Sequence, residues 1–113
     1  MENDEALDAV FFALADRRRR QLLAELAGGP KSVSELAAAA SMKTSAASKH
    51  IAVLEAGRLL YKLRDGRRLH CHLNFDVWQD VTSYVAMHAQ FWGSRLDELE
   101  AHLKETRGKS WAR

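Results

Sequence analysis

The sequence predicts a mainly α-helical domain with one β-hairpin, and three observations support this prediction. Within residues 43–54, Ala47, Ile51 and Leu54 recur at steps of four and three, which is the spacing of one helix face. Asp65-Gly66 separates two short apolar runs, a typical hairpin signal. A final segment repeats apolar residues at steps of three and four over about four heptads. Together they predict a winged helix-turn-helix with five helices, one β-hairpin wing and a long C-terminal dimerisation helix.

The first two helices are expected before residue 28. Residues 4–15 carry apolar side chains at helical spacing. Asp16 is a suitable N-cap for a second helix over residues 17–27, because its carboxylate accepts hydrogen bonds from free backbone N–H groups. The run Gly28-Gly29-Pro30 ends that helix.

The third and fourth helices form the expected helix-turn-helix. A short helix covers residues 32–40, and either Ser32 or Ser34 is its cap. Residues 41–43 form the turn. The fourth helix covers residues 44–56 and places small polar side chains on the face opposite its apolar residues.

Two strands, residues 59–63 and 68–73, follow as the wing. The sequence leaves their register open. A two-residue turn pairs Leu60 with Cys71, whereas a three-residue turn with a bulge pairs Leu59 with Cys71.

The last predicted helix runs over residues 75–105, with Asn74 as its cap. Residues 106–113 have no apolar periodicity and are predicted to be a frayed tail. The expected organisation is therefore one DNA-binding and dimerisation domain over residues 1–105, followed by that tail.

Composition is that of a folded globular protein, since 47% of the 113 residues are hydrophobic and 28% are charged. No apolar run approaches the roughly 18–20 residues of a membrane span, so no membrane partner is expected. The acidic N-terminus does not resemble a secretory signal. One cysteine cannot form an internal disulfide. These features predict a cytoplasmic protein.

The formal net charge is only +2, but the basic residues are clustered. Residues 17–20 are four arginines in succession, here called the arginine block, and seven more lysines and arginines lie between residues 43 and 68. A local basic face on a nearly neutral chain is typical of a nucleic-acid-binding surface.

Several fragments, in order, resemble the ArsR/SmtB family of bacterial repressors. Residues 13–16 followed by arginines resemble its opening motif, residues 34–37 its third helix, residues 47–55 its recognition helix and residues 66–68 its wing tip. Residues 91–100 look like the subgroup encoded beside START-like (SRPBCC) proteins. The resemblance covers about residues 7–104 and implies a homodimeric repressor that binds a double-stranded DNA operator.

The chain departs from the family pattern at three positions. Arg17 stands where a proline is common, Arg58 where a glycine is common, and Cys71 where an aromatic residue is common. The second departure predicts an unusual turn before the wing.

Small hydroxyl and cationic side chains suit base edges and phosphates, so the fourth helix is expected in the major groove and the wing on the DNA backbone or in the minor groove. His50 has two interpretations, a DNA contact or a residue that pins the recognition helix. The predicted DNA-binding residues are Lys43, Thr44, Ser45, Ser48, Lys49 and His50 on the helix, Arg64, Arg67 and Arg68 on the wing, and Arg17 and Arg20 in the arginine block.

A homodimer is expected because the first and last helices carry more apolar surface than a small domain covers. The predicted interface residues are Leu7, Val10, Phe11, Val81, Val85, His88, Trp92, Leu96 and Leu99.

His70-Cys71-His72 has side chains that bind zinc or copper. Alternate strand residues face opposite ways, however, so the thiol and the two imidazoles do not share a face. The family that this sequence resembles has two metal-site patterns, a cysteine pair on the third helix and Asp-x-His on the last helix. This sequence has neither pattern. We therefore predict no metal, no cofactor, no catalytic residues and no enzymatic activity.

Two alternatives stay open at this point: a metal- or thiol-responsive regulator that uses Cys71 and its neighbouring histidines, and a protein–protein interaction module that has lost DNA binding. The sequence identifies neither the operator nor an inducer, whether a metal or a small molecule.

Overall fold

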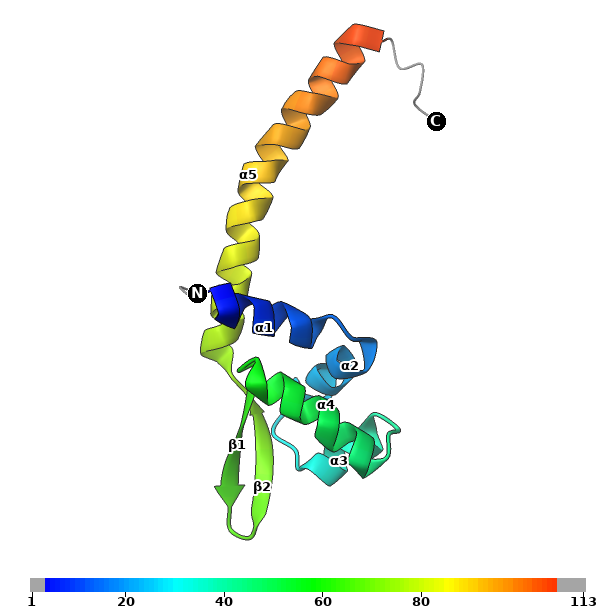
Figure 1. Cartoon of the computed structure of the whole chain (residues 1–113), viewed down its shortest axis with the longest axis vertical. Helices are drawn as coiled ribbons and strands as arrows, with labels where there is room; N and C mark the ends of the chain where they lie inside the picture. The colour runs from blue at the N-terminus through cyan, green and yellow to red at the C-terminus, as the bar shows by residue number, and fades with distance from the viewer. Residues whose placement is uncertain (1–3, 108–113) are drawn as a thin grey trace. The chain divides into compact units, whose positions relative to one another are not determined.

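The computed structural model describes residues 4–107, and these residues form five helices and one antiparallel hairpin (Figure 1). This arrangement confirms the predicted winged helix-turn-helix. The chain divides into two compact units, one ending at Gln79 and one beginning at Asp80. In chain order the elements are α1 (Asp4–Leu14), α2 (Arg17–Leu26), α3 (Val33–Ala39), α4 (Thr44–Ala56), β1 (Leu60–Asp65), β2 (Arg68–Leu73) and α5 (Phe75–Arg107).

Local hydrogen bonds explain where α2 and α3 begin. The Asp16 carboxylate accepts from the backbone N–H groups of Arg18 and Arg19, at 2.8 and 3.2 Å. Ser32 and Glu35 form a capping box, in which each side chain accepts from the backbone N–H of the other. Asp16 is thus confirmed as a cap, and Ser32 is the cap among the two serines considered.

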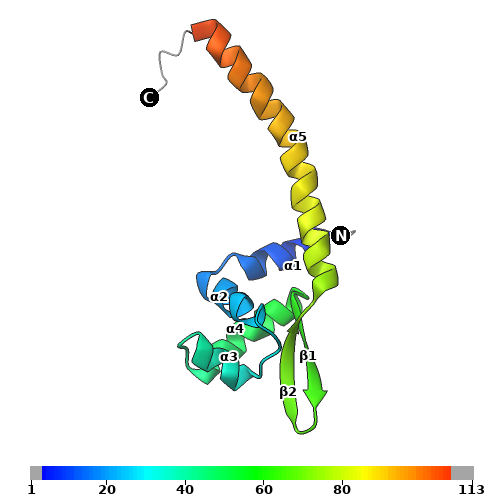
Figure 2. The ribbon, with the colours of Figure 1, turned by 180° about the vertical axis from the view of Figure 1, so that it is seen from behind.

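The core of the first unit lies between the helices of the helix-turn-helix and the helices before them. Leu22 of α2, Leu36 of α3 and Ile51 and Leu54 of α4 are fully buried, because each lies on the apolar stripe of its helix. The hairpin lies beside this helical group, and its tip points away from α1 (Figure 2).

Both predicted strand registers are wrong. Lys62 pairs with Cys71 and Asp65 with Arg68, so the two-residue turn is Gly66-Arg67. Gly66 adopts φ 66°, which a tight hairpin turn requires at its first central position and glycine tolerates without strain. From the Leu60–Cys71 register the shift equals two residues, which keeps every side chain on its predicted face, whereas from the Leu59–Cys71 register it equals three.

The junction between α4 and β1 is sterically demanding. A Cβ atom on Gly57 would lie 2.9 Å from the backbone oxygen of Ala9, so only glycine fits without a shift. The next residue, Arg58, has φ 63°, in the left-handed region that costs a non-glycine residue about 1–2 kcal/mol. The unusual turn expected from the arginine at this position is therefore present.

Helix α5 extends through Arg107, two residues beyond its predicted end at residue 105. Residues 106 and 107 are thus helical, and the rest of the predicted tail, residues 108–113, lies outside the described residues. No helix among residues 4–107 has the length and apolar character needed to cross a bilayer.

Candidate DNA-binding interface

Helix α4 has two distinct faces. Ala47, Ile51 and Leu54 are buried, with no exposed surface. The opposite face carries exposed polar side chains at Thr44, Ser45, Ser48 and Lys49, and Lys43 at the N-cap position is exposed as well. Because this face is small and polar, it allows close approach of another surface.

The wing presents its charges at the tip. Arg64, Arg67 and Arg68 are exposed on either side of the Gly66 turn. At the base of the hairpin, the Lys62 Nζ atom lies 3.5 Å from an Oε atom of Glu55 in α4. This ion pair connects the wing to the recognition helix.

A second contact connects the wing to the segment before α3. The backbone N–H of Cys71 donates to the Lys31 carbonyl at 2.7 Å, and the N–H of Lys31 donates back at 3.3 Å. Lys31 directly precedes Ser32, the N-cap of α3. The hairpin is therefore bonded to the helix-turn-helix along β2 and paired with α4 through β1, so the wing and the recognition helix are held as one surface.

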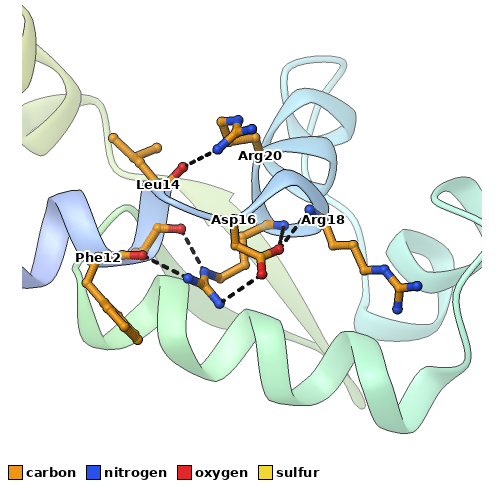
Figure 3. Close-up of polar contacts among 7 residues, drawn as sticks. Phe12, Leu14, Asp16, Arg18 and Arg20 are labelled. Atoms are coloured by element: carbon orange, nitrogen blue, oxygen red, sulfur yellow. Dashed lines mark hydrogen bonds and ion pairs between the residues drawn. The ribbon is translucent and has the colours of Figure 1, made fainter.

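Two residues of the arginine block, Arg19 and Arg20, donate to carbonyls at the end of α1 (Figure 3). The Nε atom of Arg19 donates to the Ala13 carbonyl at 2.7 Å, and its Nη2 atom donates to the Phe12 carbonyl at 2.8 Å. Arg19 is only 8% exposed, and its Nη1 atom lies 3.7 Å from the Asp16 carboxylate. The last carbonyls of a helix lack intrahelical partners, and here Arg19 adds to the Ala15 N–H, which donates to the Phe12 carbonyl at 3.2 Å. Sequence reasoning missed this role, although the absence of a C-cap residue before a run of donors was a signal for it.

Arg20 was predicted to contact DNA, but its Nη1 atom donates to the Leu14 carbonyl at 2.7 Å. The structure thus gives Arg20 a second capping role at the end of α1. Arg17 is exposed at the first position of α2.

His50 is half-buried in α4. The backbone N–H of Arg19 is the largest of the effects that lower the pKa of the Asp16 carboxyl, and the charge of His50 is the smallest. Both interpretations of His50 therefore stay open.

Known proteins are similar to this chain in both sequence and fold. A family model described as a helix-turn-helix domain matches residues 14–60, from the end of α1 to the start of β1. A crystal structure of an ArsR family transcriptional regulator is 33% identical and superimposes with a TM-score of 0.71, over 82% of this chain and 96% of that one. This chain belongs to the ArsR family of transcriptional regulators. No significant match was found among curated proteins.

Two further solved structures, each described as a possible ArsR-family or an ArsR-like regulator, are similar to this chain. The homodimeric winged helix-turn-helix DNA-binding domain of a possible ArsR-family regulator from Mycobacterium bovis is 31% identical, with a TM-score of 0.64 over 76% of this chain and 80% of that one. An ArsR-like regulator from Rhodococcus is 26% identical, with a TM-score of 0.67 over 91% of this chain and 93% of that one.

In this ArsR-family chain, Cys71 is a core residue. Its side chain is completely buried, and burial raises the pKa of the thiol. A protonated thiol is a poor nucleophile and metal ligand. His70 and His72 lie on the other face of β2, where His72 stacks on Tyr61 with ring centroids 5.3 Å apart. Within residues 4–107, no three histidine, cysteine or acidic side chains form a group able to hold a metal ion.

Replacing Cys71 with valine is therefore expected to change thermal stability by less than about 1.5 kcal/mol, because the two side chains have similar volume and polarity in a core. DNA affinity should stay the same. The comparison that tests this is release of bound DNA by zinc, copper or peroxide in both proteins. Release from the parent alone would show that Cys71 is a sensor.

Proposed function

We propose that this ArsR-family protein is a homodimeric repressor that reads a DNA operator with α4 and holds the DNA backbone with its wing. The observation that carries the proposal is the joint surface of α4 and the hairpin. On it, an exposed face of small polar residues lies next to three exposed wing arginines, and contacts on both strands of the hairpin keep the two parts together.

The face of α4 suits the major groove. The hydroxyls of Thr44, Ser45 and Ser48 are exposed donors and acceptors for base edges, and Lys49 adds a cation for guanine or phosphate. The N-terminal residues of a recognition helix make most base contacts in this fold. Sequence choice is therefore assigned to the first two turns of α4.

The wing supplies affinity. Arg67 lies in the two-residue turn, Arg68 begins β2 directly after it, and Arg64 lies on β1 two residues before Gly66, and all three are exposed. Guanidinium groups at such a tip neutralise phosphates or enter the minor groove, and they release counterions without selecting bases strongly.

A second copy of this chain is the proposed dimer partner, and it would cover the apolar residues of α5. Six large apolar side chains of the second unit are 49–60% exposed: Val85, Met87, Phe91, Trp92, Leu96 and Leu99. Val85, Trp92, Leu96 and Leu99 follow steps of seven, four and three and therefore share one side of the helix, and a monomer rarely leaves such an apolar stripe in water.

The buried members of the predicted interface have a different role. Val10 and Val81 are only 1% and 7% exposed in the single chain, so they have almost no area to offer a partner. In the first unit, Phe11 is 40% exposed and stays in the proposed interface, as does half-buried Leu7. His88 is half-buried beside Tyr84.

Two copies present two recognition helices, which match two half-sites about one helical turn apart. Binding over a promoter would then repress transcription by competing with the polymerase for the same DNA. The subgroup encoded beside START-like proteins, to which residues 91–100 are similar, is the proposed placement within the family.

The wing is tested by replacing Arg67 and Arg68 with alanine. Log affinity for DNA falls linearly with log salt concentration, with a slope of about −0.9 per neutralised phosphate. The double variant is expected to bind every sequence more weakly and with a flatter slope, measured by fluorescence anisotropy at several salt concentrations. A slope equal to that of the parent would remove the wing from the interface.

The recognition helix is tested by Thr44→Ala and Ser45→Ala. Each lost base contact is expected to cost about 1–3 kcal/mol on the preferred operator and little on random duplex DNA. Selection of binding sites from a randomised pool measures the preference. Unchanged preference in both variants would place another element in the groove, and an intact dimer that binds no DNA would favour the interaction-module alternative.

A further inference from the structure

In the arginine block, Arg18 is the residue that was not among the predicted DNA contacts and that does not cap the end of α1. Arg19 and Arg20 bind carbonyls at the end of α1. The side chain of Arg18 is exposed and points away from Arg20 (Figure 3). Its backbone N–H donates to Asp16, so the cap of α2 fixes the position from which this side chain projects.

Arg18 borders an open hollow of about 420 Å³ at the turn of the helix-turn-helix. Gln21 contributes from α2, Lys43 is a second cation at the rim, and no lining residue is acidic. The complete lining is Arg18, Gln21, Ala40, Ser41, Met42, Lys43 and Ala46. An anion is therefore the complementary ligand for this hollow.

The hollow has a defined shape because its walls are bonded together. The Gln21 side chain donates to the Ala40 carbonyl at 3.5 Å, which connects α2 to the end of α3. The Met42 N–H donates to the Ala37 carbonyl at 2.8 Å. Ser41, which lies between Ala40 and Met42 in the chain, adopts φ 55°. The turn that carries Lys43 is thus held against α2.

The same turn leads directly into α4. Ala46 lines the hollow, while its neighbours Thr44 and Ser45 belong to the exposed face proposed for the major groove. Phosphates border that groove on both sides, and contacts to them set the register of a recognition helix. A phosphate at this edge would meet Arg18 as the helix enters.

We propose that Arg18, together with Lys43, binds a backbone phosphate of the operator in this hollow, so that α2 takes part in DNA binding. The contact rests on the proposed function and deepens it. It also revises the sequence-based choice within the arginine block, because Arg20 is engaged at the end of α1 and Arg18 borders the helix-turn-helix.

The test is the salt dependence of DNA binding by Arg18→Ala. We expect the slope to become flatter by about 0.9 for each subunit, with a similar loss of affinity on operator and random duplex. Arg18→Lys should keep most of the parent slope, since an ammonium group also neutralises a phosphate. Lys104→Ala is the charge-matched control, because Lys104 is exposed on α5 near the end of the described residues. It should keep the parent slope.

The possible failures are distinguishable. One outcome would overturn this contact alone. In it, the parent binds DNA with a salt-dependent affinity, and the Arg18→Ala variant has the same salt slope and the same thermal stability as the parent. A flatter slope in Arg20→Ala but not in Arg18→Ala would overturn it and restore the sequence-based choice. A parent that binds no DNA would overturn the proposed function and the contact with it.

Discussion

Replacing Arg19 with alanine is expected to lower the free energy of unfolding by about 2–4 kcal/mol, since hydrogen bonds from a charged donor contribute more than neutral ones and the buried Ala13 carbonyl loses the Arg19 donor. The guanidinium donates to the carbonyls of Phe12 and Ala13 and lies next to the Asp16 carboxylate. Its loss removes these contacts, while Arg20 still donates to the Leu14 carbonyl at the same helix end. Urea denaturation measured by circular dichroism gives the difference.

Two neighbouring substitutions make the Arg19 result specific. Arg19→Lys should recover only part of the stability, because an ammonium group does not reproduce the planar fork that reaches two carbonyls. Arg18→Ala removes the same side chain from an exposed neighbouring position and should change stability by less than about 0.5 kcal/mol. Equal stability of Arg19→Ala and the parent would contradict the capping role.

Replacing Trp92 with alanine is expected to dissociate the proposed dimer. Trp92 is 53% exposed in the single chain and packs edge-on against Phe91, with ring centroids 5.0 Å apart. Loss of a large aromatic from a buried site costs about 3–5 kcal/mol, which corresponds to a roughly 100- to 4,000-fold weaker association. Affinity for a two-half-site operator should collapse with it, while helix content should be retained.

Sedimentation velocity over a concentration series measures this association. Ser94→Ala is the control, because Ser94 is exposed on α5 two residues after Trp92, on the opposite side of the helix. It should sediment as the parent does. An intact dimer of Trp92→Ala at low concentration would show that another surface joins the subunits.

Cap and turn chemistry explains why helix boundaries were predictable. Asp16 and Ser32 act on N–H groups two or three residues away, so the signal and its effect lie in the same short stretch of chain. The two faces of α4 were predictable for a similar reason, since the spacing of Ala47, Ile51 and Leu54 alone defines which side is apolar.

The hairpin shows where local information ends. Its glycine indicated a tight turn but not the position of that glycine within it, and two different turns were consistent with Asp65-Gly66. The observed register pairs Lys62 with Cys71, and Cys71 in turn pairs with Lys31, a residue 40 positions earlier. A pairing over that separation is a tertiary contact, and no short window of sequence contains it.

By itself the sequence determined the order of the elements, the polar face of the recognition helix and the basic wing tip, because each follows from periodicity, capping or turn residues within a few positions. Only the tertiary structure decided the roles of the arginine block and of the apolar valines. Arg19 meets the end of α1, Arg18 borders the helix-turn-helix, and Val10 is buried in the single chain. Periodicity states which residues share a face, but what covers that face depends on the packing of distant segments.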